Sequence, residues 1–240
     1  DTPTLDNVDT NTETTLFDEI NSDESSSDEN TELIVDEKIL SELNTGDLLL
    51  FNDNSPGLFG WFTKMIKWGT HSNYSHIAMV LKNPTFLDKK LEGLYIWESS
   101  WEDAPDPQDG KRKLGVQITP IREVLDAYKN GHVYARKINT WEFNQFSDYN
   151  LKKIHDVVYN KPYDICPLDW VEAFLKKDFN PQKTSRFFCS ALVGYIYTKC
   201  DVLVSDTDWS ILTPNDFSLS GETVNFMPPF SLFPQENKIK

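Results

Sequence analysis

Short apolar runs separated by turn residues begin near residue 45 and dominate the middle of the chain. This pattern is typical of buried strands. The runs are TGDLLLFN (45–52), NYSHIAMVL (73–81), LYIWESS (94–100), GVQITP (115–120) and HVYARKI (132–138). We therefore expect five strands, the first beginning near Asp47.

Apolar residues at helical spacing mark segments before, between and after these strands. The segments are SPGLFGWFTKMIKWG (55–69), PIREVLDAY (120–128), EFNQFSDYNLKKIHDVVYN (142–160), PLDWVEAFLKK (167–177), SRFFCSALVGYIY (185–197) and a helix that starts at Thr213 and Pro214. The pattern of LIVDEKILSELN (33–44) fits a strand and a short amphipathic helix equally. Strands gathered in the middle of the chain favour an α+β fold with an antiparallel sheet over alternating βαβ units.

The aromatic-rich segment 55–69 has two interpretations. Its apolar stripe can pack against the core, or it can touch lipid with Lys64 and Lys67 at the edge of the stripe. Together with WESSW (97–101), this stripe permits an acyl-lipid substrate and a peripheral membrane contact.

Acidic residues are concentrated at the start of the chain. Thirteen acidic residues and one Lys give residues 1–38 a net charge of −12, so residues 39–240 carry only −3 of the total of −15. The first 38 residues have too little apolar surface to offset the entropy of ordering, and we expect a disordered acidic tail. Residues 39–221 would form the folded domain, and the Pro-rich residues 222–240 an extended C-terminal segment.

Charge and cysteine usage bear on the classes of function. A nearly neutral body does not indicate a nucleic-acid-binding face. The scattered His and Cys residues have no tetrahedral ligand spacing, and no Gly-rich phosphate loop is visible, so we expect neither a metal nor another cofactor. Three cysteines, no visible secretory signal and no apolar run of about 18 residues predict free thiols in the cytoplasm or another reducing compartment.

Cys189 lies in the apolar segment 185–197 and has two interpretations. A cysteine inside an apolar helix is most often a packed, inert thiol. If Ser185 or a neighbour caps the helix, the sulfur lies in the first turn, where backbone N–H groups and the helix dipole stabilise a thiolate. Cys166 and Cys200 lack this helix-start position, and we expect them to be packed thiols.

Two ionisable residues lie in otherwise apolar strands. His76 shares a strand face with Ala78 and Val80, and Glu98 shares one with Ile96. His76 is either a satisfied core histidine or a general base, and Glu98 is either a solvent-facing strand end or the residue that orients this base. A thiol hydrolase needs a nucleophile, a base and an orienting group from separate parts of the chain.

Three of these motifs together resemble the NlpC-type papain-like hydrolases. CSALVGYIY (189–197) resembles the cysteine helix of that superfamily, GDLLLFN (46–52) its Gly-Asp-led strand, and SHIAMVL (75–81) the strand that carries the base histidine. Ordinary members have the cysteine helix first, whereas here it follows these strands by more than a hundred residues. That order resembles the circularly permuted branch, the YiiX/YaeF-like amidases, which has relatives among large DNA viruses of the orthopoxvirus type.

The resemblance spans roughly residues 45–217 and implies a permuted papain-like fold, with a central antiparallel sheet or partial barrel packed against helices. It implies Cys189 as nucleophile, His76 as base and Glu98 as orienting group. Tyr74 and Ser190 are expected at the substrate pocket, although Tyr74 can also be a core residue. The implied activity is that of a cysteine hydrolase or acyltransferase on a peptide, amide-linked or acyl-lipid substrate. An inactive fold member that serves as an interaction or virion protein is the alternative.

Overall fold

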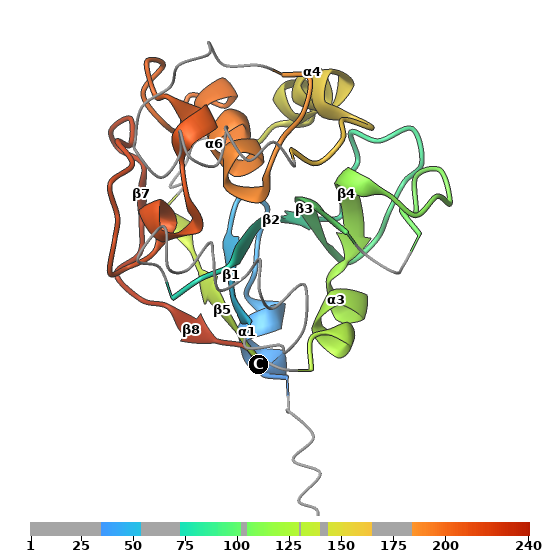
Figure 1. Cartoon of the computed structure of the whole chain (residues 1–240), viewed down its shortest axis with the longest axis horizontal. Coiled ribbons are helices and arrows are strands. Elements are labelled where there is room, and N and C mark those ends of the chain that lie inside the picture. The colour runs from blue at the N-terminus through green and yellow to red at the C-terminus, as the bar shows by residue number, and fades with distance from the viewer. Residues whose placement is uncertain (1–34, 54–72, 102–104, 130, 140–143, 165–183) are drawn as a thin grey trace, which may run out of the picture. The chain divides into compact units, whose positions relative to one another are not determined.

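A computed structural model describes residues 35–53, 73–101, 105–129, 131–139, 144–164 and 184–240. Its central element is a six-stranded antiparallel sheet in the order β4-β3-β2-β1-β5-β8, and β6 and β7 form a separate pair (Figure 1). The strands are β1 (Leu48–Asp53), β2 (His76–Lys82), β3 (Leu94–Trp101), β4 (Leu114–Pro120), β5 (Gly131–Arg136), β6 (Ile138–Asn139), β7 (Ser231–Leu232) and β8 (Asn237–Lys238). The expected α+β class with an antiparallel sheet is confirmed.

Helices precede, interrupt and follow the strands. They are α1 (Glu37–Ser41), α3 (Ile121–Ala127), α4 (Asp148–Val158) and α6 (Cys189–Lys199), with two 3-10 turns, η1 (Trp209–Ile211) and η2 (Pro214–Phe217). Side chains fix several of their starts: Ser147 accepts the Asn150 N–H at the start of α4, and Thr213 and Asp216 form a capping box at η2. The helices expected over 55–69 and 167–177 lie outside the described residues.

Both faces of the sheet are buried against helices. On one face, residues such as Leu50, Ile77 and Trp97 pack with α4 and α6, and on the other Leu49, Ala78 and others pack with α1 and α3. Figure 1 shows these two pairs of helices on opposite sides of the sheet. Because both faces are covered, the strands read as continuous apolar runs in the sequence.

The two boundaries predicted for the folded domain are wrong. Asp36 caps α1 and its backbone N–H donates to the Ile239 carbonyl oxygen at 2.8 Å, so the fold begins before residue 38. The segment 222–240 supplies β7 and β8, and β8 belongs to the main sheet. Buried Arg136 holds this segment with a bond from Nε to the Phe233 carbonyl oxygen at 3.2 Å and an ion pair to Glu222 at 2.6 Å. Of the tail predicted over residues 1–38, residues 1–34 lie outside the described residues.

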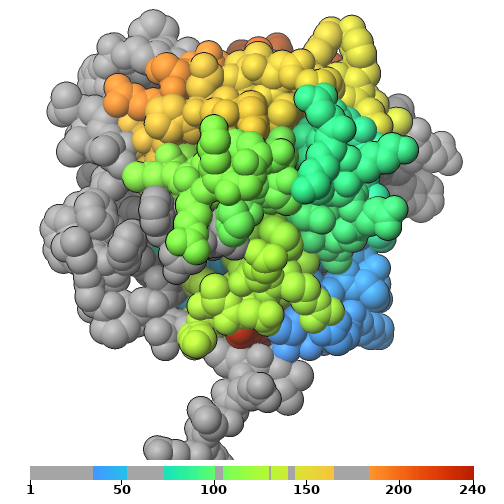
Figure 2. Space-filling model, turned by 90° about the vertical axis from the view of Figure 1, so that its right-hand side faces the viewer, coloured from blue at the N-terminus to red at the C-terminus, as the bar shows by residue number. Residues whose placement is uncertain are grey.

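Residues that follow α4 cover the β4 edge of the sheet. The Val116 N–H donates to the Lys161 carbonyl oxygen at 2.8 Å, and the Tyr163 N–H donates to the Leu114 carbonyl oxygen at 3.2 Å. Figure 2 faces this side of the molecule, where residues 105–129 (green) lie between α4 (yellow) and α1 (blue). The segment that covers this edge also lies beside the residues that precede α6, because the Phe187 N–H donates to the Pro162 carbonyl oxygen.

Candidate active site

The candidate site forms where β2 and β3 separate. Their paired residues run from Lys82 opposite Leu94 to Met79 opposite Trp97, and the pairing ends there. Strand β3 continues beyond this point paired with β4 alone. The start of β2, with His76, and the end of β3, with Glu98, are therefore free of mutual backbone pairing.

Cys189 is the first residue of α6, so its sulfur lies at the helix N-terminus. The N-cap is Phe188 rather than Ser185, and it makes no side-chain cap hydrogen bond, but the sulfur lies in the first turn as expected. The preceding backbone is fixed instead by Ser99 of β3, whose hydroxyl donates to the Phe187 carbonyl oxygen at 2.7 Å. This bond ties the start of the cysteine helix to the strand that carries Glu98.

The structure brings Cys189, His76 and Glu98 together. His76 Nε2 lies 2.8 Å from Glu98 Oε2, and the His76 ring also hydrogen-bonds the Cys189 side chain. Since Nε2 is occupied by Glu98, Nδ1 is the ring nitrogen left for the sulfur. The Phe51 ring packs against the imidazole at a centroid distance of 5.1 Å and limits its rotation.

The charges of the three groups favour a thiolate–imidazolium pair. Burial opposes the charged form of His76, but the hydrogen bonds and charges of Cys189 and Glu98 outweigh it and raise the His76 pKa to about 10. Burial alone would also raise the pKa of the Cys189 thiol, but the bond to His76 and its charge lower that pKa below the ordinary 9.0. These shifts favour the thiolate form of Cys189, which is the form in which a cysteine acts as a nucleophile.

Two backbone amides add to the stabilisation of the sulfur. The N–H groups of Ile77 and Ser190 both donate to Cys189, and both lower its pKa. The Val80 N–H donates toward β1, to the Asp47 carbonyl oxygen, so strand alternation directs the Ile77 N–H toward the opposite edge. Because β3 has already diverged there, this amide is available to the sulfur.

Burial and bonding partners bear on the interpretations of the two strand residues. Glu98 is 0% exposed, so it is not a solvent-facing strand end. The His76 side chain is 21% exposed and its ring bonds Glu98 and Cys189, which are the partners that the general-base interpretation requires. Their arrangement has the geometry that a general base and its orienting carboxylate require.

Tyr163 lies near the sulfur and was not identified from the sequence. Burial raises the pKa of its hydroxyl above the ordinary 10.0, and the nearby charges of Cys189 and Asp164 raise it further. The phenol therefore remains protonated and can donate a hydrogen bond close to Cys189. Its position depends on the bridge between Tyr163 and Phe187, a long-range contact that leaves no local pattern.

Replacing Gly115 by Ala is expected to lower the free energy of unfolding by more than about 2 kcal/mol. Gly115 has φ +148°, and a Cβ there would lie 2.3 Å from the Lys161 carbonyl oxygen, in the segment that carries Tyr163. Urea unfolding measures the loss. Gly110→Ala is the control, because Gly110 also has positive φ but nothing within 4 Å of its Cβ position. Equal losses from the two variants would contradict the proposed steric conflict.

The two residues expected at the substrate pocket have other contacts. The Tyr74 hydroxyl donates to Glu236 Oε2 at 2.5 Å, and its ring packs on Tyr134, in agreement with the core interpretation. Ser190 is 0% exposed and its hydroxyl donates to the Leu212 carbonyl oxygen at 2.7 Å. Its backbone N–H donates to Cys189, and the place of Ser190 at a substrate pocket stays a prediction.

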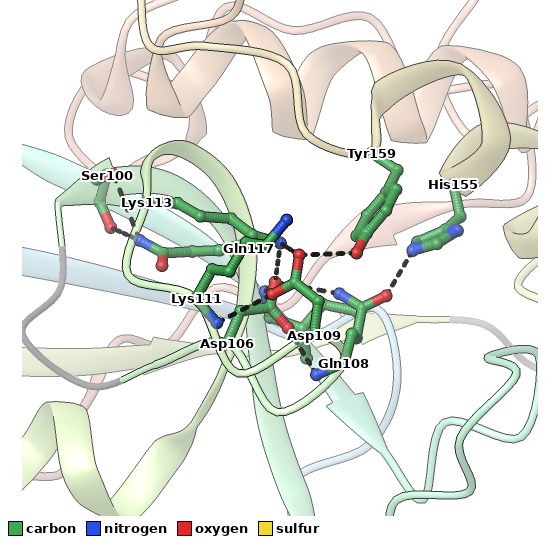
Figure 3. A network of polar contacts seen from close by, with 10 residues as sticks. Ser100, Asp106, Gln108, Asp109, Lys111, Lys113, Gln117, His155 and Tyr159 are labelled. Carbon is green, nitrogen blue, oxygen red and sulfur yellow. Dashed lines mark hydrogen bonds and ion pairs between the residues drawn. The ribbon is translucent and has the colours of Figure 1, made fainter.

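A second polar network fixes the loop between β3 and β4 (Figure 3). Buried Asp106 accepts hydrogen bonds from Lys113 Nζ at 2.8 Å and from Gln108 Nε2 at 3.1 Å. Gln108 Oε1 in turn lies 2.6 Å from His155 Nε2, a partner that the sequence did not reveal. Burial lowers the His155 pKa below the ordinary 6.5, so the ring is neutral at pH 7. The network lacks a nucleophile and holds the loop against α4.

The remaining candidates add no second site. Cys200 is 0% exposed, and burial together with the charge of Asp201 raises its pKa to about 12. Cys166 lies outside the described residues. Within the described part of the chain, no three His, Cys, Asp or Glu side chains gather as metal ligands. None of the helices described there has the length and apolar content to cross a membrane.

Comparison with known proteins leaves the site to be judged on its own geometry. A scan against protein-family models and a search of curated proteins both give no match.

Proposed function

We propose that the chain is a cysteine hydrolase or acyltransferase with a circularly permuted papain-like fold. The observation that carries this proposal is the hydrogen-bonded series of Cys189, His76 and Glu98, with the sulfur at the first residue of α6. The chain order of these residues and the packing of the cysteine helix on an antiparallel sheet support the permuted assignment.

The first chemical step would be attack of the Cys189 thiolate on a carbonyl carbon. The sulfur forms a bond to the carbon while the carbonyl oxygen takes the electron pair. The Cys189 backbone N–H, unpaired within the first turn of α6, and the Tyr163 hydroxyl would donate to this oxyanion. Collapse expels the amine or alcohol, which takes a proton from His76 Nδ1, and leaves a thioester on Cys189.

The second step would release the acyl group. Neutral His76 takes a proton from water or from an acceptor alcohol or amine, which attacks the thioester carbonyl. Cys189 leaves as a thiolate, and the protonated His76 again pairs with it. Glu98 stabilises the imidazolium in both steps. The substrate class proposed is a peptide, an amide-linked group or an acyl lipid.

Alkylation of Cys189 is expected to show a thiolate at pH values where an ordinary cysteine is protonated. The lowered pKa of Cys189 means that the thiolate persists as the pH falls below 9.0, and it is lost only below this lowered pKa. The imidazolium persists until the pH rises through about 10. The rate of reaction with iodoacetamide, followed on the Cys189 peptide by mass spectrometry from pH 4 to 10, measures this window. A single inflection near 9 would contradict the proposal.

A further inference from the structure

Behind His76, the face shared by β3 and β4 carries three buried oxygens with no hydrogen-bond partner among the described residues. They are Glu98 Oε1, Gln117 Oε1 and Thr119 Oγ1. Their residues are 0%, 1% and 2% exposed. Buried polar atoms are nearly always hydrogen-bonded, so such exceptions side by side require an explanation.

The strand register places these three side chains next to one another. Glu98 lies directly opposite Gln117, and Ile96 lies opposite Thr119. Side chains alternate along a strand, so Glu98, Gln117 and Thr119 share the face on which Ile96 packs. Residues directly opposite have Cβ atoms about 5 Å apart, and diagonal neighbours about 7 Å apart. Both β4 side chains are therefore within reach of the Glu98 carboxylate.

Thr119 and Glu98 are chemically complementary. An ionised carboxylate only accepts hydrogen bonds, and Glu98 Oε1 needs a donor because Oε2 is the oxygen that faces His76. The Thr119 hydroxyl is such a donor. The Gln117 amide nitrogen is already engaged elsewhere, because it donates to the Ser100 backbone carbonyl oxygen and to Ser100 Oγ, each at 3.2 Å (Figure 3).

We propose that Thr119 is a positioning residue whose hydroxyl donates a hydrogen bond to Glu98 Oε1 and holds the carboxylate against His76. It touches neither the substrate nor the sulfur, and it acts through Glu98 on the orientation and charge of the His76 ring. Without this bond the carboxylate can turn away from Nε2, and the imidazolium that stabilises the Cys189 thiolate loses its partner. This inference rests on the function proposed above.

The test compares the titration of Cys189 in Thr119→Val with that in Gln117→Met, a control on the same strand face. The titratable groups around the sulfur are His76 from β2, Tyr163 from the segment before α6, and Glu98 behind the imidazole. Thr119→Val acts only on the last. The iodoacetamide profile of the Cys189 peptide is expected to shift upward by about one pH unit in Thr119→Val, which slows alkylation about tenfold on the acidic limb. Gln117→Met removes the bonds to Ser100 and none to Glu98, and it is expected to leave the profile in place.

Two further variants separate positioning from general loss of stability. Thr119→Ser keeps the hydroxyl and is expected to retain the wild-type profile. Thr198→Val removes a buried hydroxyl that donates to the Gly194 carbonyl oxygen at the far end of α6, and it is expected to lower the melting temperature without moving the profile.

The outcomes distinguish this inference from the function on which it rests. A wild-type profile centred near 9 overturns the proposed function itself. A lowered wild-type profile that Thr119→Val leaves in place, even with a reduced melting temperature, overturns the positioning role and leaves the function standing. If Thr119→Val does not fold, Thr119→Ala and Thr119→Ser decide the question, and equal profiles for these two overturn the role of Thr119.

Discussion

Replacing Cys189 by Ser is expected to abolish acyl-enzyme formation and to slow hydrolysis of a generic ester, such as p-nitrophenyl acetate, by at least about 10³-fold. The reason is that His76 and two backbone amides stabilise a thiolate at this position, whereas an alcohol holds its proton far more tightly. Release of nitrophenolate measures the rate. Intact-protein mass spectrometry measures the acetyl group that the wild-type protein retains.

Cys200→Ser is the matched control for this prediction. Cys200 lies at the other end of the same helix, is 0% exposed and has a pKa raised to about 12, so it is not a nucleophile. We expect this variant to keep the wild-type ester hydrolysis and the acetyl adduct. An adduct that persists in Cys189→Ser, or one that disappears in Cys200→Ser, would show that Cys189 is not the reacting thiol.

Local patterns in the sequence were sufficient to predict the strands and to identify the ionisable residues that lie in them. The alternation of SHIAMVL placed His76 on a face with Ala78 and Val80, and the structure has this strand as β2 (His76–Lys82). The permuted order of the motifs, rather than any single motif, brought Cys189 into the same hypothesis as His76 and Glu98. The hydrogen bonds among these three groups agree with that grouping.

Contacts between distant segments account for what the sequence did not reveal. The segment 222–240 was placed outside the domain because its Pro-rich composition hides two short strands whose partners are β5 and β6. Tyr163 reaches the site through a bridge to Phe187, more than twenty residues away. Gln117 shares a face with Glu98 only because of the β3–β4 register. No periodicity or local motif encodes such pairings.

Glu98→Gln is expected to lower the reactivity of Cys189 by roughly 10²- to 10⁴-fold at pH 7. The negative charge of Glu98 is one of the causes that raise the His76 pKa to about 10, so a neutral amide lowers that pKa toward the ordinary 6.5. As His76 loses its proton at pH 7, the Cys189 pKa rises toward the ordinary 9.0 and the thiolate is lost. The iodoacetamide profile of Cys189 is the measurement, and it is expected to move to higher pH.

A buried carboxylate in the neighbouring network separates this effect from the general cost of losing a buried charge. Asp106 is 1% exposed and pairs with Lys113 at 2.8 Å, so Asp106→Asn breaks a buried ion pair and is expected to destabilise the fold by about 3 kcal/mol. It does not contact His76, and the folded fraction is expected to keep the wild-type profile. If Glu98→Gln and Asp106→Asn shift the Cys189 profile equally, then the loss of any buried charge near β3 is enough to change the Cys189 pKa. If only Glu98→Gln shifts it, the carboxylate acts through His76, as an orienting group in a catalytic series must.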